Sequence, residues 1–166
     1  ERDTRAAIAN PDGGPDSESG FVNAGGAVDM IALNHGSIDA YSLAAAIEAT
    51  VPVIDDDPGP TYGLGVSADV SLNGIDDTTW ALVRNADVDA AGLALSAKDD
   101  SNIRAAAGSM ALALSGQASV GLAGACTQNT ITGEHKASVE HSTLDLAGGL
   151  SLEAGTDGDI FSLTAS

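Results

Sequence analysis

One stretch decides the fold of this chain because the sequence contains it twice: Gly65–Ser109, which reads GVSADVSLNGIDDTTWALVRNADVDAAGLALSAKDDSNIRAAAGS. Residues 65–92 match residues 121–148 at an offset of 56 positions. After one inserted residue, Leu93–Ser109 matches Leu150–Ser166 at an offset of 57. A tandem repeat of this length predicts a stacked architecture in which each copy packs against the next.

The repeat also reaches the start of the chain. Residues 4–10 match residues 79–85 at an offset of 75, and residues 28–38 match residues 93–103 at an offset of 65. We therefore expect one repetitive domain over residues 1–166. Its copies are predicted at residues 4–78, 79–134 and, incompletely, 135–166.

Two insertions interrupt the first copy, at residues 11–20 and 51–60. The fall of the offset from 75 to 65 assigns ten residues to the first insertion. Both segments combine prolines and glycines with acidic residues, which is typical of solvated loops. We expect both insertions to lie outside the stack.

Alternation of small or apolar residues with polar ones predicts that the copies are all β. Leu43–Ala49 is rich in strong helix formers, but its counterpart in the next copy contains Gly108, so a strand is expected there too. Asn73-Gly74 is a turn signal that would end the strand before it. In the central copy about four strands are predicted, at residues 79–88, 93–97, 103–114 and 120–131.

Stacked copies place like residues over one another, such as Ile75 over Ile131 and Val83 over Val139. These apolar ladders predict a parallel β-solenoid (β-helix) built from tandem repeats of about 56 residues. Alanine and glycine at inward positions predict a flattened cross-section with closely spaced sheets. The alternative architecture is a duplicated β-sandwich.

The composition limits the partners. The 166 residues carry a net charge of −18, from 24 acidic residues against six basic ones. Such a surface repels nucleic acid and anionic membranes, and no stretch is apolar enough for membrane insertion. The single cysteine, Cys126, aligns with Val70 and is expected to be a small buried apolar residue. No charged-then-apolar leader opens the chain, so a mature or excised chain is expected.

Three runs resemble the repeats of very large secreted bacterial surface proteins, the filamentous-haemagglutinin-like adhesins. They are residues 88–97, 103–111 and 120–131, which read VDAAGLALSA, IRAAAGSMA and VGLAGACTQNTI. The resemblance covers most of the chain and is low in complexity. It implies an exported, extended β-helical stalk used in attachment.

Stacked acidic turns are the candidate calcium site. Asp99-Asp100-Ser101-Asn102 aligns with Thr156-Asp157-Gly158-Asp159, and Asp55-Asp56-Asp57 lies in the second insertion. Calcium takes several oxygen ligands, which such turns could supply. The first copy has Asn34-His35-Gly36-Ser37 at this place, however, so solvated turns without an ion are the alternative. We assign no metal or cofactor-binding residue.

No catalytic constellation is predicted. His35, His135 and His141 lie on turns or outward positions without metal-ligand spacing. The Asp-x-Asp pairs Asp87/Asp89 and Asp157/Asp159 lack a row of aromatic residues for stacking a sugar, because Trp80, Tyr41 and Tyr62 are scattered. Thr78, Thr79, Thr130 and Thr132 do not form the regular ladder of an ice-binding surface.

These observations predict a non-enzymatic extracellular or cell-surface structural protein, a stalk or filament-forming segment. Open solenoid ends carry unpaired strand edges, so its expected partner is itself, head-to-tail or within a longer repeat array. Cell-surface glycans are the second expected partner. The alternative from another class is a fragment of a polysaccharide-acting β-helix enzyme of the lyase or tailspike type.

Overall fold

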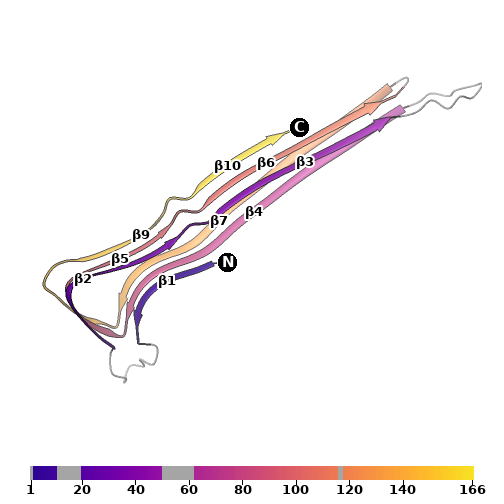
Figure 1. The fold of residues 1–166 in the computed structure, drawn as a ribbon. Coiled ribbons are helices and arrows are strands. Elements are labelled where there is room, and N and C mark those ends of the chain that lie inside the picture. Colours follow the sequence, from indigo (N-terminus) through magenta and orange to yellow (C-terminus); the bar gives the residue numbers. More distant parts are fainter. Residues whose placement is uncertain (1, 11–19, 50–61, 116–117) are drawn as a thin grey trace, which may run out of the picture. The chain divides into compact units, whose positions relative to one another are not determined.

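The computed structural model describes residues 2–10, 20–49, 62–115 and 118–166, and these residues fold as β-structure (Figure 1). The second predicted insertion, at residues 51–60, lies outside the described residues. The chain divides into two compact units, each formed by three segments. Unit 1 contains Glu1–Ser37, Gly74–Asn102 and Ile131–Asp159, and unit 2 contains Ile38–Asn73, Ile103–Thr130 and Ile160–Ser166.

The described residues form ten strands in three sheets. One sheet has the order β1-β4-β7, the second joins β2, β5, β8 and β9, and the third has the order β3-β6-β10. Equivalent strands of successive copies pair in parallel, as a β-solenoid of about three turns requires, and this confirms the predicted fold class. The strands are β1 (Arg2–Ala9), β2 (Gly20–Asn34), β3 (Ser37–Ala49), β4 (Tyr62–Arg84), β5 (Ala86–Asp99), β6 (Asn102–Leu114), β7 (Ala118–Glu140), β8 (Thr143–Leu146), β9 (Leu150–Thr156) and β10 (Asp159–Ala165).

The strand register reproduces the offsets of the repeat. Thr4 pairs with Thr79 at an offset of 75, and Leu93 pairs with Leu150 at an offset of 57. The first insertion is shorter than predicted, because Gly20 already pairs with Ala86 at the start of β2. Residues 11–19 of this insertion lie outside the described residues. The remaining extra residue lies in an irregularity of β2 between Ala24 and Ala27, so the sequence offset had combined the insertion with a β-bulge.

The predicted strand boundaries were partly wrong. The expected strand at residues 79–88 is divided at Asn85, whose φ of 51° lies in the left-handed region that asparagine tolerates well. His141, one copy later, has a φ of 49° at the equivalent place. Conversely, β4 runs through Asn73-Gly74 without a turn. The Asn73 side chain instead donates a hydrogen bond to Asn129 Oδ1 at 2.8 Å, an amide pair between neighbouring strands.

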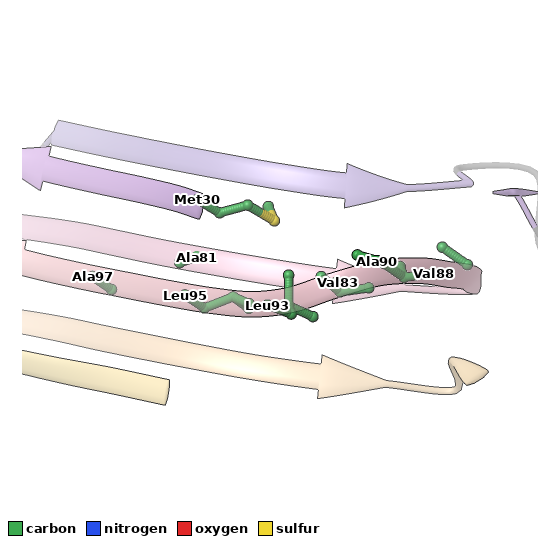
Figure 2. Close-up of a cluster of buried hydrophobic side chains, with 9 residues drawn as sticks. Met30, Ala81, Val83, Val88, Ala90, Leu93, Leu95 and Ala97 are labelled. Carbon is green, nitrogen blue, oxygen red and sulfur yellow. The ribbon is translucent and has the colours of Figure 1, made fainter. Parts of the chain in front are cut away.

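Unit 1 has an apolar core between its two sheets. Figure 2 shows Val83 of β4 close to Leu93 and Leu95 of β5, in a cluster of buried side chains. Leu95 is 1% exposed and Val83 is fully buried. These residues belong to the central turn, so a neighbouring copy covers each of them on both sides. The ladder predicted at Val83 is therefore the core of this unit.

Unit 2 has the opposite distribution of side-chain sizes. Its buried positions include Ala105, Ala107 and Ser109, whereas large apolar side chains point outward. A Cβ built on Gly121 would lie 2.6 Å from the carbonyl oxygen of Ala111, and one on Gly65 would lie 3.1 Å from that of Leu112. The two sheets of unit 2 thus approach to backbone contact, as the glycine and alanine content predicted.

Candidate functional site

A group of polar side chains lies buried inside unit 1, where the ladder of apolar residues ends. Asp77 comes from β4, Asp99 ends β5, Asn34 ends β2 and Ser101 follows β5, and none of them is more than 5% exposed. His135 comes from β7 and is half-buried. Alternation along β4 explains why a charge is inside, since Asp77 shares the inward side with Ile75 and Thr79. We call these five residues the polar cluster.

Asn34 links the two carboxylates of the polar cluster. Its side-chain Nδ2 donates hydrogen bonds of 2.8 Å to Asp77 Oδ2 and 2.8 Å to Asp99 Oδ1. The Ser101 hydroxyl lies 2.6 Å from Asp99 Oδ1 and 3.3 Å from Asp77 Oδ2. Thr156 Oγ1 donates a further hydrogen bond of 3.4 Å to Asp99 Oδ2. Neutral donors therefore hold one oxygen of Asp77 and both oxygens of Asp99 in a fixed orientation.

The opposite atoms of the cluster are left without partners. Among the described residues, Asp77 Oδ1, His135 Nδ1 and Thr79 Oγ1 are buried and make no hydrogen bond. Burial first, and the neighbouring Asp99 carboxylate second, raise the pKa of Asp77 above its usual range. One oxygen atom of Asp77 and one nitrogen atom of His135 are thus buried without a hydrogen-bond partner in the described chain.

Glycines in the neighbouring copies make room for the cluster. A Cβ on Gly133 would lie 2.5 Å from Asp77 Oδ1 and 2.9 Å from His135 Nε2. A Cβ on Gly36 would lie 2.9 Å from Ser101 Oγ. The repeat places Gly133 beside Asp77, and Gly36 beside Ser101. At both positions a neighbouring copy thus has a glycine, which has no side chain, beside a polar residue of the central copy.

Within the described residues, the acidic turns that were candidates for calcium do not gather into one group of ligands. Asp99 is buried rather than solvated, because it continues the inward row of β5 after Leu95 and Ala97. Asp100 and Asn102 lie on the surface side, where Asp100 Oδ2 is 3.2 Å from His35 Nδ1. Asp157 and Asp159 are exposed, and Asp55-Asp56-Asp57 lies outside the described residues.

The structure corrects two predictions about single side chains. Cys126 is exposed, and so is Val70 at the equivalent position, because the outward side of β4 and β7 is the apolar side in unit 2. His135 does not lie on an outward position but in the polar cluster. His35 and His141 are exposed, as expected.

The other candidate residues do not gather into a catalytic arrangement within the described residues. Asp87 is half-buried and Asp89 is exposed on β5. Trp80 lies on the outer side of β4, with the Arg5 guanidinium 4.6 Å and Lys136 Nζ 5.8 Å from its ring. Its ring is thus already stacked by two cations. Tyr41 and Tyr62 belong to unit 2.

The polar cluster could not be predicted from ligand spacing along the chain. Its members come from four segments that lie far apart in sequence and meet only when the copies stack. A signal was present, however: Asp77 and His135 both fall on inward positions of the alternation, and the counterpart of Asp77 in the next copy is Gly133.

A second feature is the apolar outer surface of unit 2, which we call the outer rows. Val66, Val70 and Leu72 of β4 are 60%, 62% and 68% exposed. On the other sheet, Leu43 of β3 is 80% exposed and Phe161 of β10 is 60% exposed. The outer rows also include Tyr41, Ile47, Leu64, Met110, Leu112 and Leu122.

Comparisons with protein-family models, with curated proteins and with solved structures find no match for this chain. The described part of the chain contains no helix of the length and hydrophobicity that a membrane crossing requires. The features of the chain that point to a function are therefore the polar cluster, the outer rows and the edges of the sheets.

Proposed function

We propose that this chain is a non-enzymatic structural segment of an extracellular or cell-surface protein, and that it acts by self-association. The observation that carries the proposal is the outer rows of unit 2. Monomeric proteins seldom expose contiguous apolar patches of this kind, and such patches usually mark interaction surfaces. Fully burying one Val or Leu side chain is worth roughly 1.5–3 kcal/mol, so a partner that covers several of them gains a large free energy.

The strand edges support the same proposal. Within the described residues, β1 and β7 are the outer strands of their sheet, and β2 and β3 are outer strands of theirs. Each outer strand has one backbone edge without a partner strand in the described chain. Such edges can pair with a strand of another chain, which would lengthen the stack head-to-tail.

A net charge of −18 sets the conditions under which association is expected. Like charges repel at low ionic strength, whereas salt screens them over about 10 Å at 0.1 M. Kosmotropic salts such as sulfate also strengthen apolar association. Self-association should therefore increase with salt, and attachment through a longer array, as in the adhesins that the sequence resembles, would use the same surfaces.

We expect the purified chain to form oligomers or fibres whose fraction rises with protein concentration and with sulfate. Sedimentation velocity measures the oligomer fraction, and negative-stain electron microscopy identifies fibres. Replacing both Val66 and Val70 with threonine keeps the β-branched shape and removes apolar surface. This double variant should weaken association by about tenfold, because roughly 1.4 kcal/mol corresponds to that factor.

A matched control changes two exposed apolar residues of unit 1, Ile31 and Leu33 of β2, to threonine. It should associate like the wild type. A wild-type chain that stays monomeric under all these conditions would refute the proposal. An equal loss in both double variants would place the association elsewhere than on the outer rows.

A further inference from the structure

We propose that the polar cluster of unit 1 binds one divalent transition-metal ion through Asp77, Asp99 and His135. The ligand atoms of these three residues all lie within 4.8 Å of one another. Three ligands at about 2.1 Å from one metal ion are at most about 3.6 Å from one another, so a pair at the 4.8 Å limit would need to close by roughly 1 Å. This binding goes beyond the self-association proposed above and does not depend on it.

The unpartnered atoms point to an ion at this place. Asp77 is only 1% exposed, and its Oδ1 makes no hydrogen bond within the described chain. A Cβ built on Gly133 would meet both Asp77 Oδ1 and His135 Nε2, which places these two atoms in the same small region. The ring nitrogen of His135 that lacks a hydrogen bond is Nδ1. A buried carboxylate oxygen without a partner is destabilising, and metal coordination removes that cost.

The charge of the cluster favours a cation as well. Within the described residues, no lysine or arginine forms an ion pair with Asp77 or Asp99, although both are buried. Asn34 and Ser101 supply only neutral donors. A divalent ion would balance the two carboxylates, since buried charges are otherwise paired or neutralised by a proton.

The donor set selects the class of metal. Calcium and magnesium prefer oxygen ligands throughout, whereas one imidazole beside two carboxylates suits zinc and other divalent transition metals better. Asn34 and Ser101 hold Asp77 Oδ2 and Asp99 Oδ1, which leaves Asp77 Oδ1 for the metal. Asp99 Oδ2 accepts a hydrogen bond of 3.4 Å from Thr156 Oγ1 and would be shared between that hydroxyl and the ion. Such outer hydrogen bonds orient metal ligands in known sites. Three protein ligands leave a further position open for water.

The test uses the whole chain, stripped of metal with a chelator and then titrated with zinc, manganese, calcium or magnesium. We expect one zinc or manganese ion per chain by calorimetry and elemental analysis, and binding to calcium and magnesium at least tenfold weaker. Cobalt is a spectroscopic probe, and its visible bands should show nitrogen and oxygen coordination at one site. The midpoint temperature of thermal unfolding, measured by the fluorescence of Trp80, should rise when zinc is added.

The variants His135→Gln and Asp77→Asn should each weaken zinc binding by at least tenfold and abolish the cobalt bands. The matched controls are His35→Gln and Asp100→Asn, an exposed histidine–aspartate pair of the same unit, which should leave binding unchanged. Asp77→Asn keeps the shape and removes a buried charge, so in chelator it should unfold no more easily than the wild type. This separates loss of metal from loss of fold.

Three results would overturn the proposal. One is the absence of stoichiometric zinc or manganese binding by the folded chain. Another is binding that survives His135→Gln and Asp77→Asn but disappears with the exposed pair, which would place the ion on the surface. The third is a calcium affinity equal to that for zinc. After either of the first two results, a shared proton between Asp77 and Asp99 would be the better account of the cluster, and the third would make the site one for hard cations in general.

Discussion

Replacing Leu95 with alanine is expected to lower the free energy of unfolding by about 2–5 kcal/mol. Leu95 is 1% exposed and belongs to the buried cluster of unit 1. The central turn is covered by a copy on each side, so the surrounding ladder cannot collapse into the cavity. Urea unfolding followed by the fluorescence of Trp80, which lies in the same unit, measures the loss.

Leu152→Ala is the matched control for this variant. Leu152 pairs with Leu95 in the strand register, but it belongs to the last copy and is 47% exposed. The same deletion of side-chain atoms should therefore cost less than about 1 kcal/mol there. If Leu95→Ala cost no more than Leu152→Ala, the central turn would not be the core of unit 1. If both cost several kcal/mol, a further chain would cover Leu152 in solution.

The stacking of copies was predictable from the sequence because a solenoid converts sequence offsets directly into strand register. Thr4 pairs with Thr79, and Leu93 pairs with Leu150, at the offsets that the repeat gives. The pairing depends only on which residues are similar. It needs no knowledge of which side of a strand faces inward, and this is why it could be derived without a structure.

The inward side of each strand was harder to predict, because size and hydrophobicity give opposite indications in the two units. In unit 1 the large residues, such as Leu95, are inside. In unit 2 the fully buried Ile103 lies at the start of its segment, but where the sheets approach at Gly121 and Ala111 only small residues fit between them, and Leu72 faces outward. Cys126 was therefore placed on the wrong side, although its alignment with Val70 was right.

The polar cluster could not be predicted from spacing, because its geometry depends on three copies at once. Asp77, Asp99 and His135 lie in different strands, and their approach is made possible by Gly133. In the sequence Asp99 is one of several acidic residues at a turn, and only the continuation of β5 distinguishes it from Asp100. The direction of a side chain at the end of a strand decides between a solvated charge and a buried ligand.

Gly121→Ala is expected to destabilise the chain by about 1–3 kcal/mol, although alanine adds only one methyl group. The added Cβ would lie 2.6 Å from the carbonyl oxygen of Ala111, and 3.2 Å from its carbonyl carbon. Because both contacts are with backbone, no side chain can rotate away, and the two sheets of unit 2 must separate. Hydrogen exchange of β6 and β7 should report this opening locally, and circular dichroism in urea should report the total loss.

Gly124→Ala tests the same change three residues later in β7, where a Cβ would meet no atom within 4 Å. Alanine should be neutral there or stabilise the strand by about 0.4–1 kcal/mol, because it reduces the freedom of the unfolded chain. Three residues separate the two glycines, so Gly121 lies on the inward side of the strand and Gly124 on its outward side. Backbone strain does not enter the contrast, because no described glycine has a positive φ. Equal effects of the two variants would mean that the sheets of unit 2 are not in backbone contact, and the outward placement of its large apolar side chains would lose its physical reason.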